Sequence, residues 1–434
     1  MSLLKKSQPR NRVERSGRKL ILNYLLSAGL FLAVITVYPA AAQTWTQVNV
    51  ANTNWFTIVS SADGSILYAS GGNTNSQQVY TSTNSGTTWN QTTQPTTNSV
   101  WGLAVSADGT KLFATRGLPG YAPFGATNNT PFFVSSDSGL SWNPIGLPMT
   151  NYIYSTAMSA DGNVLVAGIQ SPRPYLDLIY ISTNTGATWS TNLFPSGNYH
   201  NVLITANGQK ILAFISPNGL LTTTDAGTTW TTNNLPASSY TWRSIAGSAN
   251  GNMLAAIGHK SLGTFVCLST NAGTSWTTST VSAFAYNPAG NIAMSADGSM
   301  LIAPTSGAVF LSTNFGLSWL QSFTLTTNWN VTVSSADGKK LVIAALGVTD
   351  FKKATGAIWT SQTTPSPQLN AASFLSNLAL KWTIPSTNFV LQQSSDLVSW
   401  TNVANPPILN LTNLQNEVMI SPTNSSSFYR LKTP

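Results

Sequence analysis

Short apolar stretches alternate with polar turns along most of this chain. In one unit the apolar segments are Gly102–Val105, Lys111–Thr115 and Phe132–Ser135, and Trp142 opens a fourth segment after the last turn. Short runs of this kind, bounded by turns rich in Gly, Asn, Asp and Ser, are typical of strands joined in hairpins. The pattern therefore predicts four short strands per unit and an all-β fold.

The units repeat along the chain with a recognisable first turn, Ser-Ala-Asp-Gly or a close relative. Its seven copies are 40 to 53 residues apart, and they begin at Ser61, Ser106, Ser159, Thr205, Ser248, Ser295 and Ser335. Gly in such a turn can supply the positive φ that a tight hairpin needs. A repeat of about 45 residues with four strands has the size of one propeller blade.

A second motif, Ser/Thr-x-Asn/Asp-x-Gly-x-Thr/Ser-Trp, follows six of these turns. Its copies are Ser82–Trp89, Ser135–Trp142, Ser182–Trp189, Thr223–Trp230, Ser269–Trp276 and Ser312–Trp319. We expect the Asn or Asp side chain to accept hydrogen bonds from the backbone of its own loop. The Gly permits a tight reversal, and the Trp ring is expected to pack beneath it.

The seventh unit lacks this octapeptide and a fourth strand after its third strand, Ala357–Ser361. The missing piece is found at the other end, where Thr44–Gln47 resembles Thr88–Gln91. An N-terminal strand that completes the last blade would pair edges that are otherwise exposed. We therefore predict a seven-bladed β-propeller over residues 43–362, closed by the N-terminal strand.

Residues 363–370 form a predicted linker rich in Pro, Ser and Thr. The remaining residues, 371–434, contain five alternating segments: Leu378–Trp382, Phe389–Gln393, Trp400–Val403, Glu417–Ile420 and Phe428–Leu431. This pattern predicts a small β-sandwich. A domain of about 65 residues is marginal by itself, and docking on the propeller is one way to stabilise it.

The octapeptide resembles the Asp-box, also called the bacterial neuraminidase repeat. This box occurs in sialidases, xyloglucanases, sortilin-type receptors and photosystem II assembly factor-like propellers. The resemblance covers residues 44–362 and implies a propeller in which the boxes are structural hairpins remote from the ligand face. It does not define one function, because these families differ in chemistry. The C-terminal segment resembles a short domain at the ends of large secreted bacterial proteins, on the pattern Phe389–Ser394, Trp400 and Phe428–Leu431.

Charge is scarce and concentrated at the N-terminus. The 434 residues have a formal net charge of +8, but seven of the 20 basic residues precede position 20, and an apolar run follows from Leu20 to Tyr38. This order, followed by small residues, predicts a secretory signal peptide over residues 1–42, with an uncleaved membrane anchor as the alternative. The remaining 13 basic and 11 acidic residues give no support for a nucleic-acid partner. We expect a secreted, cell-surface or periplasmic monomer.

The sequence contains few residues that could bind a transition metal or form a disulfide. Cys267 is the single cysteine, which excludes an intramolecular disulfide, and its apolar neighbours predict a buried strand position. The two histidines, His200 and His259, have no carboxylate cluster near them in the sequence. We expect neither a metal nor another cofactor.

Two enzyme classes can be tested against the residues of the predicted propeller. A sialidase-like site needs three arginines, which Arg116, Arg173 and Arg243 could supply. Its tyrosine nucleophile also needs a glutamate, and residues 43–362 contain no glutamate. A xyloglucanase-like site needs two facing carboxylates. Seven of the nine Asp residues there belong to the two turn motifs, leaving Asp177 and Asp350 in loops of well-separated blades. We expect no catalytic residues, with a glycoside hydrolase acting on extracellular glycans as the alternative.

Large rings precede most of the first turns by five or six residues: Trp55, Trp101, Tyr154, His200, Trp242 and Trp329. This position begins the innermost strand, near the channel mouth, where aromatic faces could stack on sugars or grip a peptide. Packing between blades is the alternative.

Loops of unequal length add further candidates on the same face, because extended loops often carry function. The longest adds Tyr121 and Phe124, and a second adds Tyr175. Together with the rings, the binding candidates are Arg116, Arg173, Arg243, Asp177 and Asp350. We therefore predict an exported, non-catalytic binding or scaffold propeller whose loop face recognises a glycan or a protein.

Overall fold

The described part of the chain is built from β-strands that pair antiparallel. The computed structural model describes residues 22–24, 44–48, 50, 54–73, 76–93, 100–116, 132–145, 152–170, 177–194, 198–216, 219–235, 241–260, 263–279, 290–305, 307–324, 328–346, 356–362, 369–374, 377–383, 390–396, 398–421 and 427–432. No helix in these segments is long and apolar enough to cross a membrane.

Between residues 45 and 362 the described strands form seven four-stranded sheets, each with its strands in simple up-and-down order. The first three are β3 (Asn54–Ser60), β4 (Leu67–Asn73), β5 (Ser76–Ser82) and β6 (Asn90–Gln91); β7 (Val100–Val105), β8 (Leu112–Arg116), β9 (Phe132–Ser135) and β10 (Asn143–Ile145); and β11 (Tyr152–Met158), β12 (Leu165–Gln170), β13 (Asp177–Ser182) and β14 (Ser190–Phe194).

The next three are β15 (Asn198–Ile204), β16 (Ile211–Ser216), β17 (Gly219–Thr223) and β18 (Thr231–Asn234); β19 (Thr241–Gly247), β20 (Leu254–Lys260), β21 (Gly263–Ser269) and β22 (Thr277–Ser279); and β23 (Ala293–Met294), β24 (Leu301–Pro304), β25 (Ala308–Ser312) and β26 (Leu320–Thr324). The last sheet contains β27 (Asn328–Ser334), β28 (Lys340–Leu346), β29 (Ile358–Gln362) and, from the other end of the chain, β2 (Trp45–Gln47).

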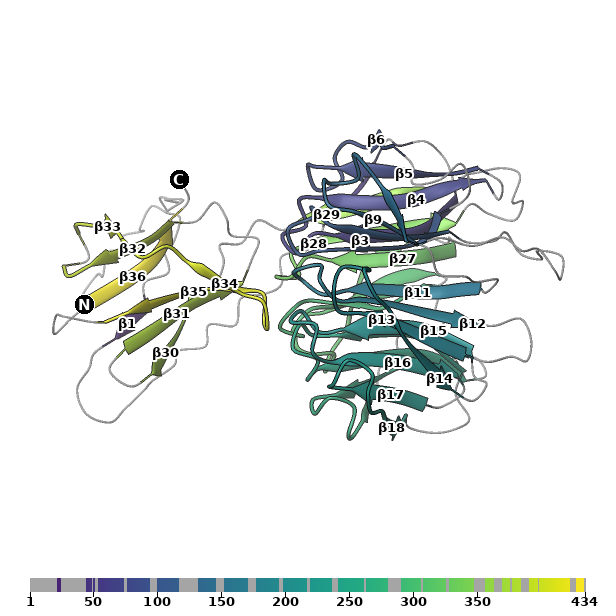
Figure 1. Ribbon diagram of the computed structural model, residues 1–434. Helices are drawn as coiled ribbons and strands as arrows, with labels where there is room; N and C mark the ends of the chain where they lie inside the picture. Colours follow the sequence, from purple (N-terminus) through teal and green to yellow (C-terminus); the bar gives the residue numbers. More distant parts are fainter. Residues whose placement is uncertain are drawn as a thin grey trace, which may run out of the picture.

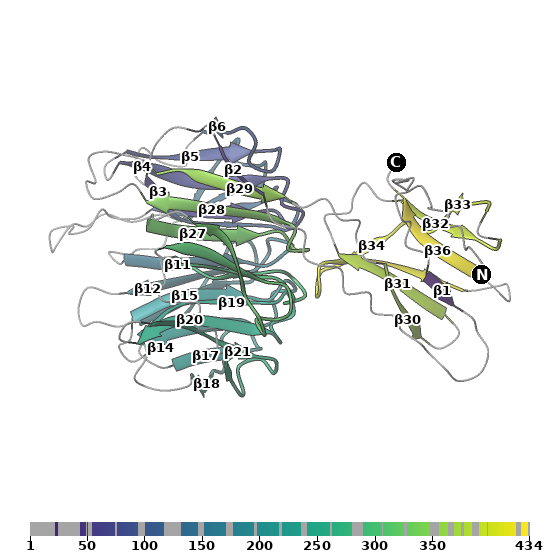
Figure 2. The same cartoon turned by 180° about the vertical axis from the view of Figure 1, so that it is seen from behind.

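The sheets are arranged around a common axis, with their first strands innermost (Figures 1 and 2). Each first strand contacts the first strand of the next sheet, and β27 returns to β3. The first turns are joined in the same order, because the second residue of each turn donates its N–H to the carbonyl of its counterpart in the next, at 2.7 or 2.8 Å. Ala336 donates back to Ala62, which closes the cycle. We call these seven residues the alanine ring: Ala62, Ala107, Ala160, Ala206, Ala249, Ala296 and Ala336. A closed ring of four-stranded sheets is a β-propeller.

The N-terminal strand has the pairing that the sequence predicts for it. β2 pairs antiparallel with β29, with Thr46 opposite Thr360. The ladder continues where Val48 donates its N–H to the Ile358 carbonyl at 2.9 Å. The indole of Trp45 donates to Ser322 Oγ at 2.9 Å, which ties β2 to the neighbouring sheet. The two distant ends of residues 45–362 therefore meet in one sheet.

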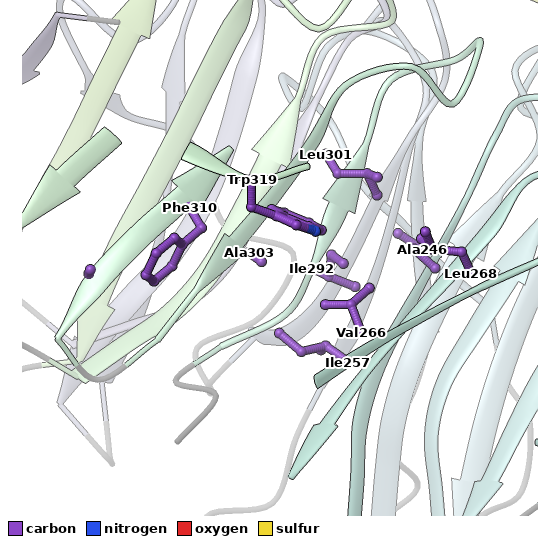
Figure 3. Packing of buried hydrophobic residues seen from close by; sticks show 11 residues of the cluster. Ala246, Ile257, Val266, Leu268, Ile292, Leu301, Ala303, Phe310 and Trp319 are labelled. Carbon is purple, nitrogen blue, oxygen red and sulfur yellow. The ribbon is translucent and has the colours of Figure 1, made fainter. Parts of the chain in front are cut away.

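The core of the propeller lies in layers between neighbouring sheets. In one layer, Ala246, Ile257, Val266 and Leu268 of one sheet face Ile292, Leu301, Ala303, Phe310 and Trp319 of the next (Figure 3). Cys267 is fully buried on β21, as its apolar neighbours predicted. Because every sheet is covered by apolar residues on both faces, each blade depends on its neighbours for its core.

The octapeptides form turns held by their own side chains. In the first copy, Ser82 Oγ accepts the Gly86 N–H at 2.9 Å and Asn84 Oδ1 accepts the Thr88 N–H at 2.9 Å. The Trp89 indole donates to the Gly86 carbonyl at 3.0 Å. Gly86 has a φ of 84°, and a Cβ there would lie 2.7 Å from Thr360 Cγ2. The expected hydrogen bonds from the loop backbone to the Asn or Asp side chain are thus confirmed.

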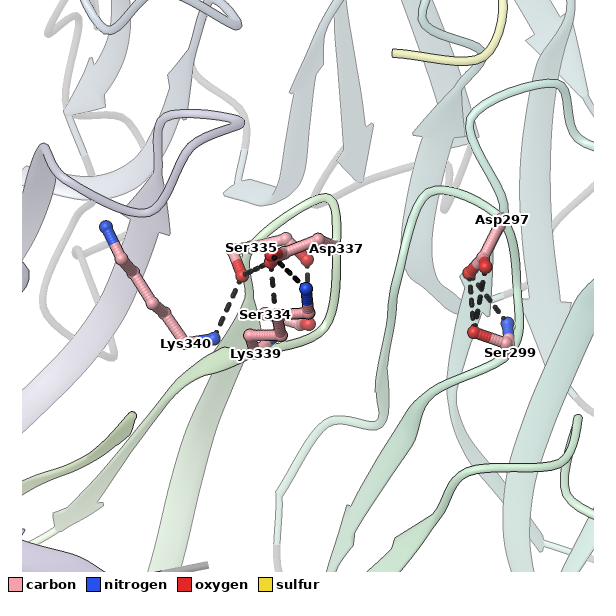
Figure 4. Close-up of polar contacts among 7 residues, drawn as sticks. All are labelled: Asp297, Ser299, Ser334, Ser335, Asp337, Lys339 and Lys340. Atoms are coloured by element: carbon pink, nitrogen blue, oxygen red, sulfur yellow. Dashed lines mark hydrogen bonds and ion pairs between the residues drawn. The ribbon is translucent and has the colours of Figure 1, made fainter. Parts of the chain in front are cut away.

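Two first turns shown in Figure 4 differ in the surroundings of their carboxylates. Asp297 accepts hydrogen bonds from the backbone and side chain of Ser299. Asp337 accepts the Lys339 N–H at 3.1 Å, and its second oxygen lies 3.8 Å from Lys339 Nζ. Burial raises the pKa of Asp337, outweighing its hydrogen bonds from Ser335 and Lys339 and the nearby lysine charges.

This raised pKa predicts that the Asp337→Asn variant is at least as stable at pH 7 as the parent protein. A raised pKa means that ionisation of Asp337 costs folding free energy at neutral pH, and that this cost disappears as pH falls through the folded-state pKa. Asn207 and Asn250 already occupy the equivalent position in two other turns and accept the same backbone hydrogen bond. Thermal denaturation at pH 7 and pH 3 measures the effect.

The control is Asp63→Asn in another first turn. There burial opposes ionisation, but hydrogen bonds from Ser61 and Ser65 outweigh it and lower the pKa of Asp63. The ionised carboxylate therefore stabilises the fold above its unfolded-state pKa, and this contribution is lost as pH falls. Asp63→Asn should lower stability at pH 7. Equal losses for both variants at pH 7 would contradict the assignment for Asp337.

The C-terminal residues form two further four-stranded sheets. One contains β30 (Asn370–Phe374), β31 (Asn377–Thr383), β35 (Gln415–Ile420) and β34 (Ile408–Asn410); the other contains β1 (Leu22–Tyr24), β36 (Ser427–Lys432), β32 (Val390–Ser394) and β33 (Thr401–Asn402). Leu380, Trp382 and Val418 of the first sheet share a buried cluster with Leu391 and Tyr429 of the second. β1 belongs to the predicted signal peptide and is an edge strand beside β36.

The C-terminal unit lies beside the face of the propeller that carries the first turns (Figures 1 and 2). The hairpin between β34 and β35 points toward that face. Its residue Leu414 packs against the cluster of the buried residues Ala62 and Ala336, as do the half-buried residues Ala107 and Ala296. The docking that the sequence suggested as a way to stabilise this unit is thus present.

Candidate functional site

A cavity of about 590 Å³ lies on the propeller axis and is lined mainly by the first strands of the sheets. These strands contribute Thr57 and Val59 from β3, Gly102 from β7, Ser155 and Thr156 from β11, Asn201 from β15, Trp242, Arg243 and Ser244 from β19, and Val331 from β27. Gly290 and Asn291, just before β23, complete this part of the wall. The cavity is large enough for a small ligand or a side chain of a partner, and its walls come from distant parts of the sequence.

A register shift at the start of the first strands decides which side chains face this cavity. In six sheets the pairing of the first and second strands skips one residue at the same place. The skipped residues are Phe56, Trp101, Tyr154, His200, Arg243 and Asn330. A β-bulge of this kind re-aims a side chain. Of the skipped residues, the two whose side chains the structure describes, Phe56 and Arg243, both line the cavity.

The predicted rings therefore divide into two groups according to their distance from the first turn. Trp55, Trp242 and Trp329, six residues before it, are 0%, 1% and 2% exposed and pack in the layers between sheets. Trp101, Tyr154 and His200, five residues before it, are the skipped residues of β7, β11 and β15. Packing between blades thus accounts for the first group, although Trp242 also contributes to the cavity wall.

The other predicted site residues are placed as follows. Arg243 is exposed and lies in the cavity wall. Arg116 ends β8 and Asp177 begins β13, so the backbone puts both at the loop end of their sheets. Tyr121, Phe124, Arg173, Tyr175 and Asp350 lie outside the described residues. Among the three arginines and two aspartates considered for an enzyme site, Arg243 is the one whose side chain the structure describes, and it lies in the cavity wall.

Two polar groups beside Arg243 lack hydrogen-bond partners within the protein. Ser244 is 2% exposed, and its buried hydroxyl has no partner. His259, on the adjacent strand β20, lines the same cavity, and its Nδ1 is also buried without a partner. Buried polar groups are normally satisfied, so these two mark a place where a ligand or an ordered water completes the structure. Neither residue belongs to a repeated motif, so no pattern in the sequence points to it.

Asn291 has a structural role in the part of the cavity wall next to β19, just before β23. Its side-chain oxygen accepts the Thr332 N–H at 2.8 Å, and its side-chain nitrogen donates to the Thr332 carbonyl at 3.1 Å. Asn291 thereby imitates a paired strand residue and ties the segment before β23 to β27. It positions the wall of the cavity, and both polar atoms of its side chain already take part in these hydrogen bonds.

The chemistry of the cavity favours binding of a polar or anionic group. Arg243 supplies a permanently charged fork of donors, and the described residues that line the cavity include no Asp or Glu. In the described part of the chain no group of three His, Cys, Asp or Glu residues could hold a metal ion. The expectation that the protein uses no metal or other cofactor stays a prediction.

The sequence matches no protein-family model and no curated protein. Solved structures with the same fold do match. YCF48 from Cyanidioschyzon merolae has a TM-score of 0.54 at 15% identity over 73% of this chain and 98% of its own, and YCF48 bound to D1 peptide has the same TM-score and identity over 77% and 100%. An oligogalacturonate lyase in complex with manganese has a TM-score of 0.54 at 12% identity over 75% and 97%. At these identities the likeness shows the β-propeller fold alone.

Proposed function

We propose that this chain is an exported, non-catalytic binding or scaffold protein: a seven-bladed Asp-box propeller, followed by a small β-sandwich, that holds a segment of a partner protein in its axial cavity. The observation that carries the proposal is the group formed by Arg243, Ser244 and His259. A charged donor beside two unsatisfied buried polar atoms suits a ligand that enters the cavity and accepts hydrogen bonds.

The choice of a protein segment over a glycan rests on two points. YCF48, which has a similar fold, has a structure bound to D1 peptide. The positive charge of Arg243 in the cavity wall also favours a ligand with an anionic group, such as the carboxylate of an acidic side chain or of a chain end. Phe56, at the same skipped position as Arg243, adds an aromatic surface that can contact the apolar part of a peptide.

The test is binding of the purified protein to an array of peptides that end in, or contain, acidic residues. Arg243→Ala is expected to weaken binding about tenfold to a hundredfold, since hydrogen bonds to charged groups contribute about 1.5–3 kcal/mol. Arg243→Lys should restore part of this loss, because Lys keeps the charge and loses the planar fork. Titration by calorimetry or fluorescence anisotropy gives the dissociation constants.

The matched control is Lys111→Met, which removes one positive charge on the opposite face. Lys111 donates to the Asp161 carbonyl on the turn face, remote from the cavity wall. The Lys111→Met variant should bind the peptides as tightly as the parent protein. Unchanged binding by Arg243→Ala would contradict the proposed site, whereas binding of glycans in place of peptides, lost in Arg243→Ala, would keep the site and change the ligand class. Turnover of aryl glycosides or polysaccharides would favour a glycoside hydrolase.

A further inference from the structure

Leu414 has an unusual backbone conformation for its residue type. Seven non-glycine residues in the described segments have a positive φ, and six of them occupy the same octapeptide position: Ser85, Ser138, Thr185, Ala226, Ala272 and Phe315. The seventh is Leu414, with a φ of 54°, in the hairpin between β34 and β35. Such positions in short hairpin loops normally carry Gly or Asn, because a Cβ crowds the carbonyl in the left-handed conformation.

The hairpin tip, residues 411–414, is held by its own hydrogen bonds. Leu414 donates its N–H to the Asn410 carbonyl at 2.9 Å, and the Asn410 side chain accepts the Thr412 N–H at 2.8 Å. The Asn413 side chain accepts the Gln415 N–H at 3.1 Å. These contacts keep Leu414 in its disfavoured conformation, and strain of this kind persists where a residue has a specific role.

The surface that Leu414 contacts is built to receive an aliphatic side chain. Leu414 packs against the cluster of Ala62 and Ala336, 9% and 6% exposed, and Ala107 and Ala296 pack against the same cluster. The peptide groups of these four residues are already engaged in the alanine ring, since each of the four donates its N–H to the next turn and each accepts from the previous one. Their methyl groups therefore form an apolar seat around the propeller axis. A leucine placed there covers no unpaired N–H or carbonyl of these four residues.

We infer that the C-terminal unit is a stopper for the channel: its hairpin tip seats Leu414 on the alanine ring and closes the axis at the turn end. Ligands then reach the cavity from the loop end. The inference does not depend on which ligand the cavity takes, because it concerns the opposite mouth. It also explains why a leucine stands where Gly or Asn would be less strained, since only a large apolar side chain fills the seat.

The test uses Leu414→Gly and Leu414→Asn, which fit the local conformation better than leucine and cannot fill the seat. Both variants should leave the C-terminal unit folded and release it from the propeller. The readout is the rate at which a thiol reagent labels a cysteine introduced by Ala62→Cys, against the slow background of the fully buried Cys267. Loss of Leu414 should speed labelling about tenfold or more, as expected when the apolar contact of a half-buried leucine is removed.

Thr412→Gly is the matched control, because Thr412 is exposed on the same tip and is not part of the seat. It should leave the labelling rate unchanged. Equal rates in the parent and in Leu414→Gly would overturn the inference. If the glycine variant fails to fold, the double variant Ala336→Cys and Leu414→Cys decides the question: a disulfide that closes within one chain supports the stopper, and free thiols after mild oxidation refute it.

Discussion

Removal of residues 43–49 is expected to lower the free energy of unfolding by about 3–6 kcal/mol, the largest effect predicted for a short change in this chain. These residues supply β2, the strand that joins the two ends of the propeller. Val48 is 8% exposed in the cluster that contains Trp55, and it donates a hydrogen bond to Ile358. Trp45 adds its bond to Ser322 and lies 5.7 Å from the ring of Phe323.

The truncated chain should begin at Val50 and be compared by urea denaturation with a chain that begins at Gln43. Its strand β29 then becomes an open edge, which also predicts association between molecules. A synthetic peptide of residues 43–49 should restore stability in proportion to its concentration, as a ligand of the native state does. Equal denaturation midpoints for the two chains would show that the N-terminal strand does not close the propeller.

Trp55→Ala is expected to cost about 3–5 kcal/mol of stability, in the range found for removal of a large buried aromatic side chain. Trp55 is 0% exposed and packs between the first and last sheets with Ile58, Leu67 and Val331. Its ring contacts Tyr80 edge-on at 5.3 Å. No neighbouring sheet can move inward to fill the space, because each blade is held on both sides.

The control for this substitution is Leu317→Ala, which removes an apolar side chain that is 77% exposed. Exposed substitutions of this kind usually change stability by less than about 0.5 kcal/mol. Thermal and urea denaturation of both variants, together with peptide binding at a temperature where both are folded, separates the two roles considered for this ring. Loss of binding by folded Trp55→Ala without loss of stability would assign it to the ligand, against its burial.

The repeats made most of the strand positions predictable. The predicted third strand Phe132–Ser135 coincides with β9, and Ala357–Ser361 differs from β29 by one residue at each end. Two C-terminal strands escaped prediction: β30, which begins at Asn370 within the predicted linker, and the short β34. Neither belongs to a repeat, and each is an edge strand that, among the described strands, pairs only with the strand following it in the chain.

The candidate site was less predictable, for a reason that lies in the bulge of the first strands. A shift of one residue turns a side chain to the other face of a sheet. Spacings of five and six residues before the turn looked equivalent in the sequence, yet Trp242 is buried between sheets while its neighbour Arg243 is exposed in the cavity. His259 and Ser244 were missed because their importance comes from unpaired atoms, which depend on three-dimensional surroundings.

The alanine ring restricts how the gene for this protein can change. Each turn both gives a hydrogen bond to the next and takes one from the previous, so the cycle has no first or last member. Loss or duplication of one unit leaves a buried donor and acceptor to find new partners, and it also changes the angle at which every neighbour meets. Deletion of one unit is therefore expected to disturb contacts all around the circle, whereas a substitution in an exposed loop disturbs only its own surroundings.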